Sequence, residues 1–177
     1  MHHVAEPLDN VRDISGIAYG FMASRRFPEL QATILDFPSV QAAAAAFADE
    51  AGMRERIAFT PGNALETQWP AGQDAVLMSY LLSAVSASGV DQLLERAFAA
   101  LKPGGRVILH DFMVDDEGRG PATAALWLVN ALLIDPDVAR LAPRFLEERL
   151  RAHGFGEFQH APVIPGITRM ITAVRVR

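Results

Sequence analysis

The sequence predicts an α/β fold built on a Rossmann-like, doubly wound sheet. Two apolar runs, residues 75–78 and 107–109, have the composition of parallel strands that are buried on both faces. An amphipathic helix over residues 90–101 lies between them, so the three segments form one strand–helix–strand unit. Two later strands, at 157–161 and 168–175, are joined by a short loop and are expected to be antiparallel. We therefore expect a mostly parallel sheet with an antiparallel C-terminal pair and helices on both faces.

The chain before this unit also alternates between strands and helices. The expected elements are strands at 31–35, 56–60 and 74–79 and a helix at 40–51. Ser39 is in position to cap this helix, and Gly52 is in position to end it. Residues 11–27 are harder to assign, because Gly16 and Gly20 fit either a glycine-rich, ligand-binding first turn or a helix entry with no ligand.

Two helices are expected between the strand–helix–strand unit and the closing strands. Residues 122–134 form a long apolar helix that carries Trp127 and Asn130, and residues 143–153 form an amphipathic helix that Gly154 ends. The apolar helix could form a wall of a binding site or part of the core.

Composition excludes several classes of function. The 177 residues suggest a single domain, and the net charge of −5 without a dense basic cluster argues against nucleic acid as a partner. There are no cysteines, and no apolar run approaches the ~20 residues that span a membrane. Residues 1–12 lack the apolar core of a signal peptide, and we expect His2 and His3 to be solvated. We therefore expect a cytoplasmic protein with no membrane contact and no metal site.

Two strand ends carry candidate ligand-binding residues. Asp36 follows the strand at 31–35, where an acidic residue commonly accepts hydrogen bonds from ribose hydroxyls, although an aspartate there is also often a simple cap. Gly62-Asn63-Ala64 follows the strand at 56–60 and suits the edge of a flat aromatic ligand, although an ordinary turn has the same composition.

The order of these segments resembles class I S-adenosylmethionine-dependent methyltransferases. More narrowly, it is similar to the small-molecule O-methyltransferase family that includes caffeate, acetylserotonin and hydroxyneurosporene methyltransferases. The resemblance covers roughly residues 27–177. It is carried by the segments Phe27-Pro28-Glu29-Leu30, Ile34-Leu35-Asp36-Phe37-Pro38, Gly62-Asn63-Ala64-Leu65 and Leu101-Lys102-Pro103-Gly104-Gly105-Arg106, and by the closing strand pair.

The resemblance implies S-adenosylmethionine as the cofactor and assigns residues to it. Asp36, with Phe37 beside it, matches the acidic residue that holds the ribose, and Gly62, Asn63 and Ala64 match the segment that contacts the adenine. Two further sets are Ser79 and Tyr80, which match the segment on the methionine side, and Gly16, which falls in the region of the glycine-rich loop.

The chain departs from the family in three ways. The region that matches the glycine-rich loop, Asp13 to Gly20, is short of glycines and also resembles a helix of the family's N-terminal domain. The family's catalytic histidine is replaced by Ser83, and a serine of ordinary pKa cannot deprotonate a phenol. Most of the family's N-terminal domain has no counterpart, so we expect one catalytic domain over 1–177 with a degenerate or poorly ordered start at 1–26.

Asp111 and His110 are the candidate catalytic residues. Asp111 matches the acidic residue that orients the family's histidine, and His110 is a candidate replacement base or a structural histidine. Neighbouring strand residues point to opposite faces, so the two do not easily serve one site. Ser83, Trp127 and Asn130 are the candidate residues for binding the acceptor.

The expected function is O-methylation of a small, aromatic or lipophilic hydroxyl acceptor. The resemblance also implies a homodimer. The main alternative is a non-catalytic remnant of the fold that acts by association with another protein. A nicotinamide dehydrogenase fits worse, because no Gly-x-Gly-x-x-Gly sequence follows the first strand.

Overall fold

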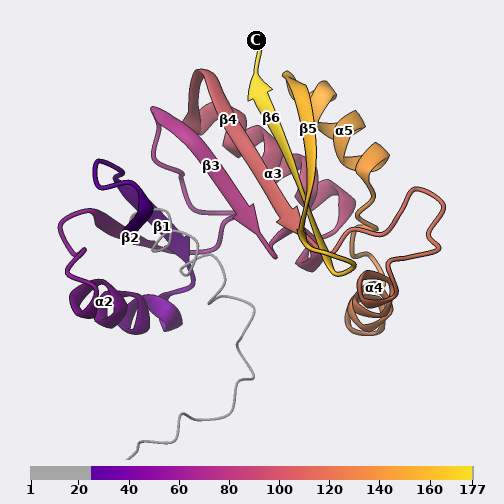
Figure 1. Ribbon diagram of the computed structural model, residues 1–177, viewed down its shortest axis with the longest axis horizontal. Helices are drawn as coiled ribbons and strands as arrows, with labels where there is room; N and C mark the ends of the chain where they lie inside the picture. The colour runs from indigo at the N-terminus through magenta and orange to yellow at the C-terminus, as the bar shows by residue number, and fades with distance from the viewer. Residues whose placement is uncertain (1–24, 177) are drawn as a thin grey trace, which may run out of the picture. The chain divides into compact units, whose positions relative to one another are not determined.

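A computed structural model describes residues 25–176 of the chain (Figure 1). The chain divides into two compact units, one ending at Pro61 and the other formed by Gly62–Arg177. Each unit is described by itself below. The single domain expected over 1–177 stays a prediction, and the proposed loop at Asp13 to Gly20 lies outside the described residues.

The first unit contains a small parallel sheet with one helix. Strand β1 (Ala32–Asp36) pairs in parallel with β2 (Ile57–Pro61), and α2 (Gln41–Glu50) connects them. Ile34, Val40 and Ala44 form its buried core. The predicted Ser39 cap is wrong, because the helix is entered through the 3-10 turn η1 (Pro38–Val40) and no side chain caps its first N–H groups.

The second unit is organised around a four-stranded sheet. Its strands are β3 (Gln73–Ser79), β4 (Leu101–Asp111), β5 (Phe155–Ile164) and β6 (Thr168–Arg175), in the order β3-β4-β6-β5. β3 and β4 are parallel, whereas β6 is antiparallel to both β4 and β5. The α/β class and the antiparallel C-terminal pair are confirmed, but only two of the four pairings in the described residues are parallel.

Helix α3 (Ala87–Ala100) supplies most of the helical side of this unit's core. It begins at Ser86, whose hydroxyl accepts a hydrogen bond from the N–H of Gly89. The helix buries Val90, Leu93, Leu94 and Ala97 in one cluster with Val107 and Leu109 of β4. Helix α5 (Pro143–Ala152) lies on the same face of the sheet (Figure 1). The expectation that helices cover both faces of the sheet stays a prediction.

Helix α4 (Ala122–Ile134) lies beyond the carboxyl ends of β3 and β4 (Figure 1). Its small residues Ala124 and Ala131 are buried, whereas Leu126, Val129 and Leu133 are exposed. The helix therefore places small side chains against the rest of the unit. None of the helices between residues 25 and 176 is long and apolar enough to cross a membrane.

Leu109 tests how much the shared core of β4 and α3 contributes to stability. Its side chain is fully buried, so Leu109→Ala is expected to lower the free energy of unfolding by about 2–5 kcal/mol through lost contacts and a cavity. Leu133→Ala, at a position that is 82% exposed, is the control and should change it by less than about 0.5 kcal/mol. Urea unfolding followed by circular dichroism measures both. Equal effects of the two variants would contradict this assignment of the core.

Candidate active site

The carboxyl end of β3 turns sharply into the next segment at Tyr80. Tyr80 has a φ of 53°, which is uncommon for a residue other than glycine, and its N–H donates to the carbonyl oxygen of His110 at 2.9 Å. The 3-10 turn η2 (Leu82–Ala84) begins two residues later. Ser79 and Tyr80 thus lie where parallel strands place ligand-binding residues, and their assignment to the cofactor's methionine side stays a prediction.

His110 is buried and held from both sides. Its Nδ1 lies 2.9 Å from the hydroxyl oxygen of Ser79 on β3, and its Nε2 lies 3.0 Å from the hydroxyl oxygen of Thr168 on β6. Burial lowers the pKa of His110, which favours the neutral ring. As the general base of the prediction, it would have to exchange one of these hydrogen bonds for one to the acceptor.

Asp111 is the last residue of β4. Its hydrogen-bond partners are different from those of His110. One carboxylate oxygen accepts the N–H of Ser83 at 3.0 Å, and the other accepts the N–H of Phe112 at 2.8 Å. Burial raises the pKa of Asp111 to about 6, although the Ser83 hydroxyl and the backbone N–H groups around the carboxylate oppose the rise. The structure therefore brings Asp111 to residue 83, the position at which the family's histidine was expected.

A row of aromatic rings runs from His110 to helix α4. The ring centroids of His110 and Tyr80 are 4.7 Å apart, and those of Tyr80 and Phe112 are 5.1 Å apart. Phe112 then stacks on Trp127 with a centroid distance of 4.6 Å and an interplanar angle of 21°. Sequence analysis missed Phe112, and the available signal was its place directly after Asp111 at the end of a buried strand.

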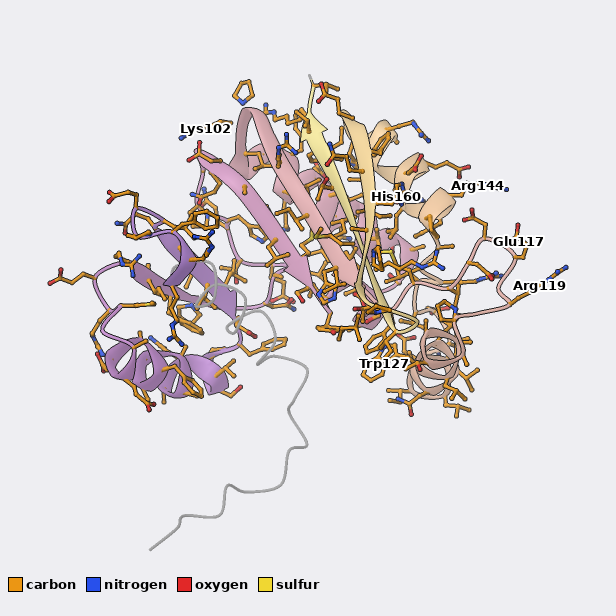
Figure 2. All side chains as sticks on the ribbon, in the orientation of Figure 1. Lys102, Glu117, Arg119, Trp127, Arg144 and His160 are labelled. Carbon is orange, nitrogen blue, oxygen red and sulfur yellow. The ribbon has the colours of Figure 1, made fainter. Side chains whose placement is uncertain are left out.

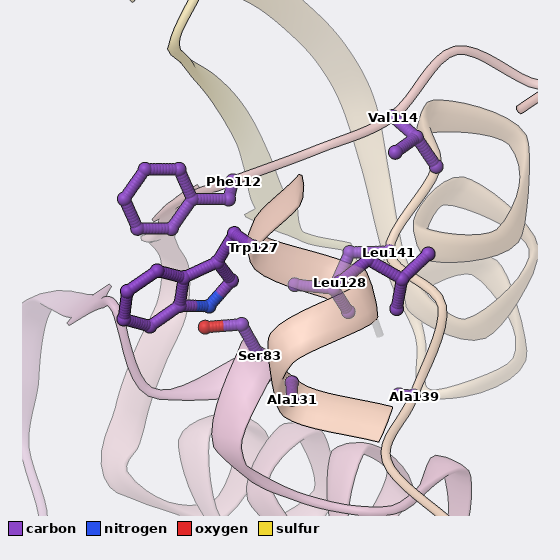
Figure 3. A pocket seen from close by; sticks show the side chains of 8 residues that line it. All are labelled: Ser83, Phe112, Val114, Trp127, Leu128, Ala131, Ala139 and Leu141. Carbon is purple, nitrogen blue, oxygen red and sulfur yellow. The ribbon is translucent and has the colours of Figure 1, made fainter. Parts of the chain in front are cut away.

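A small apolar pocket lies at the carboxyl ends of these strands (Figure 3). Its lining residues are Ser83, Phe112, Val114, Trp127, Leu128, Ala131, Ala139 and Leu141. The space open to the centre of a water molecule is about 10 Å³, about enough for one water. The hydroxyl of Ser83 is buried here, close enough to the Asp111 carboxylate to lower the pKa of that group, and it makes no well-formed hydrogen bond to any other residue among 25–176.

The two α4 residues expected to bind the acceptor are placed differently. Trp127 lines the pocket and lies on the side of α4 that faces the strand ends (Figure 2). Asn130 is exposed and is not among the lining residues, so its assignment finds no support in the pocket geometry.

The first unit carries a carboxylate that can accept hydrogen bonds from the hydroxyl groups of a ribose. Asp36 is half-buried at the carboxyl end of β1, and one of its oxygens accepts the N–H of Phe37 at 2.7 Å. Phe37 is 47% exposed, so its ring can meet a ligand. A carboxylate at a strand end and an adjacent aromatic ring match the donor and stacking requirements of a nucleoside.

Residues 62–65 of the second unit form a self-contained turn. The side-chain oxygen of Asn63 accepts the N–H of Leu65 at 3.0 Å, and the carbonyl oxygen of Ala64 accepts the indole N–H of Trp69 at 2.9 Å. A Cβ at Gly62 would lie 1.9 Å from the hydroxyl oxygen of Thr67, so the turn itself requires this glycine. Asn63 keeps a second lone pair for an adenine amino group.

Two further predictions concern a cofactor residue, Gly16, and the absence of a metal site. Gly16 is outside the described residues. Within residues 25–176, no group of three His, Asp or Glu side chains is placed to hold a metal ion.

Comparison with known proteins identifies relatives of this chain. A sequence model of the O-methyltransferase domain family matches residues 6–156. The chain is 34% identical over 131 residues to 3-hydroxy-5-methyl-1-naphthoate 3-O-methyltransferase of Streptomyces sahachiroi, covering 71% of this chain and 38% of that protein. It is 36% identical over 99 residues to L-tyrosine C(3)-methyltransferase of Streptomyces lavendulae, covering 56% and 27%.

A solved structure agrees with these sequence matches. The S-adenosylmethionine-dependent methyltransferase SibL superposes with a TM-score of 0.78 at 28% identity, over 92% of this chain and 49% of SibL. The chain therefore spans less than half the length of these three relatives.

The raised pKa of Asp111 predicts a specific dependence of stability on pH. The folded state keeps the Asp111 proton up to about pH 6, whereas the unfolded chain loses it near pH 4, so stability falls as the pH rises through this window. Asp111→Asn removes this titration. The difference in unfolding free energy between the wild type and this variant should fall by roughly 2–3 kcal/mol from about pH 4 to about pH 7. A constant difference across the window would show that the pKa of Asp111 is not raised.

Proposed function

Because the chain belongs to the O-methyltransferase domain family, whose cofactor is S-adenosylmethionine, we propose that the protein methylates the hydroxyl group of a small aromatic or lipophilic acceptor. The observation that carries this proposal is the buried Ser83 hydroxyl in an apolar pocket at the carboxyl ends of β3 and β4. Open α/β sheets bind their ligands at this edge.

Each of the two units carries residues that we assign to the cofactor. Asp36 would accept hydrogen bonds from the ribose, Asn63 would accept one from the adenine, and Ser79 and Tyr80 would contact the methionine portion. When bound, S-adenosylmethionine supplies an electrophilic methyl group on a positively charged sulfur. The remaining work of the protein is to align the acceptor with this methyl group and to exclude water.

The pocket supports an acceptor with a flat apolar body and one hydroxyl. The stacked rings of Phe112 and Trp127 offer a flat wall, and Ser83 offers a hydrogen bond to the reacting oxygen. Because Ser83 cannot act as a base, an acidic phenol is favoured over an aliphatic alcohol. The space of the pocket is about that of one water, so the acceptor ring would enter beside Trp127 by moving other side chains of the lining.

Binding of S-adenosylhomocysteine tests the cofactor part of the proposal. Isothermal titration calorimetry should give a dissociation constant in the micromolar range, and Asp36→Ala should weaken binding by about 10- to 100-fold, the typical loss for a hydrogen bond to a charged group. Asp49→Ala is the matched control, because Asp49 is an exposed carboxylate on α2 of the same unit. No binding to the wild type at millimolar ligand would favour the non-catalytic alternative.

Transfer of a labelled methyl group tests the acceptor. A hydroxynaphthoate should be methylated faster than an aliphatic alcohol of similar size, because it gives up its proton more readily. Ser83→Ala should lower kcat/KM for the phenol by about two- to tenfold through one lost hydrogen bond, whereas Ser88→Ala, at an exposed serine of α3, should not change it. Equal rates with the phenol and the alcohol would contradict the proposed acceptor class.

A further inference from the structure

Three neighbouring strands are joined by a chain of side-chain hydrogen bonds. Thr168 on β6 contacts Nε2 of His110 on β4, and Nδ1 of His110 contacts Ser79 on β3, at 3.0 Å and 2.9 Å. Thr168 and His110 are almost fully buried, at 1% and 2% exposure, and Ser79 is half-buried. This series of hydrogen bonds therefore begins in the core and ends at the carboxyl edge of the sheet, where the ligand is proposed to bind.

The hydrogen bonds of Thr168 determine which nitrogen of His110 carries the proton. The Thr168 hydroxyl oxygen already accepts the N–H of Ile164 at 3.2 Å. Within the described residues, the only group placed to accept the Thr168 hydroxyl hydrogen is Nε2 of His110. A buried hydroxyl hydrogen without an acceptor is costly, so Thr168 donates to Nε2, and Nδ1 carries the proton.

This proton position sets the direction of the last hydrogen bond. Nδ1–H of His110 donates to the Ser79 oxygen, which leaves the hydrogen of the Ser79 hydroxyl for another acceptor. His110 also holds the next residue, since its carbonyl oxygen accepts the N–H of Tyr80 and its ring lies against the Tyr80 ring. Ser79 and Tyr80 are thus both oriented by one histidine.

We propose that His110 is a positioning residue whose Nδ1–H tautomer, fixed by Thr168, presents the Ser79 hydroxyl as a hydrogen-bond donor to an acceptor oxygen of the bound cofactor. The identity of this ligand rests on the function proposed above, whereas the direction of the hydrogen bonds does not. His110 acts here through Ser79 and Tyr80 and is not the base.

Nuclear magnetic resonance of protein with ¹⁵N-labelled histidine tests the tautomer without any ligand. Two-bond ¹H–¹⁵N correlations distinguish Nδ1–H from Nε2–H rings, and the signals of His110 are those missing in His110→Gln. We expect the Nδ1–H pattern in the wild type and its partial loss in Thr168→Val, which removes the donor to Nε2. An Nε2–H pattern in the wild type would overturn the proposal.

Two variants at residue 110 separate positioning from general stability. An asparagine places its amide nitrogen near the position of Nδ1 and can still donate to Ser79, whereas a glutamine places its amide nitrogen near that of Nε2. His110→Asn should therefore bind S-adenosylhomocysteine within about twofold of the wild type, and His110→Gln about two- to tenfold more weakly. His160→Gln is the control, because His160 is an exposed residue of β5 that contacts Glu147 (Figure 2).

The outcomes distinguish this inference from the function on which it rests. Wild-type affinity in both variants at residue 110, or an equal loss in both, would overturn the positioning role. If the wild type binds no S-adenosylhomocysteine, the proposed function fails, and the tautomer of His110 alone then decides the direction of the hydrogen bonds.

Discussion

One buried carboxylate holds the candidate site together. Asp111 is fully buried, and a charge in that position is tolerated only when hydrogen-bond donors surround it. Two of its donors, the N–H groups of Ser83 and Phe112, belong to the segments that leave β3 and β4. The carboxylate therefore ties the two strand exits together, and Ser83, Phe112 and their contacts with α4 depend on that tie.

The alternation of side chains along β4 gives its last two residues separate tasks. His110 connects sideways to Ser79 and Thr168 in the neighbouring strands, whereas Asp111 connects to the turn that follows β3. This separation is the one expected from a period of two. It also explains how a chain without the family's histidine can keep an ordered strand end, because neither network needs a side chain longer than serine at position 83.

Much of this fold could be predicted from the sequence, because local patterns determine it. Helix α4 and strand β6 have the predicted bounds, since an uninterrupted apolar run and a strict alternation define them. Features that depend on distant contacts could not be predicted. The left-handed backbone of Tyr80 requires the carbonyl group of His110, and the place of Phe112 in the site requires Trp127, which comes 15 residues later in the printed sequence.

The stack of Trp127 on Phe112 gives the pocket an optical signal of its own. Indole emission depends on the polarity around the ring, so a molecule that enters beside Trp127 will change its wavelength or intensity. The indole N–H of the other tryptophan, Trp69, donates a hydrogen bond to the carbonyl oxygen of Ala64, in the turn assigned to the adenine. Under the proposed function, Trp69 belongs to the cofactor side and Trp127 to the acceptor side, so variants that keep only one tryptophan would report the two ligands separately.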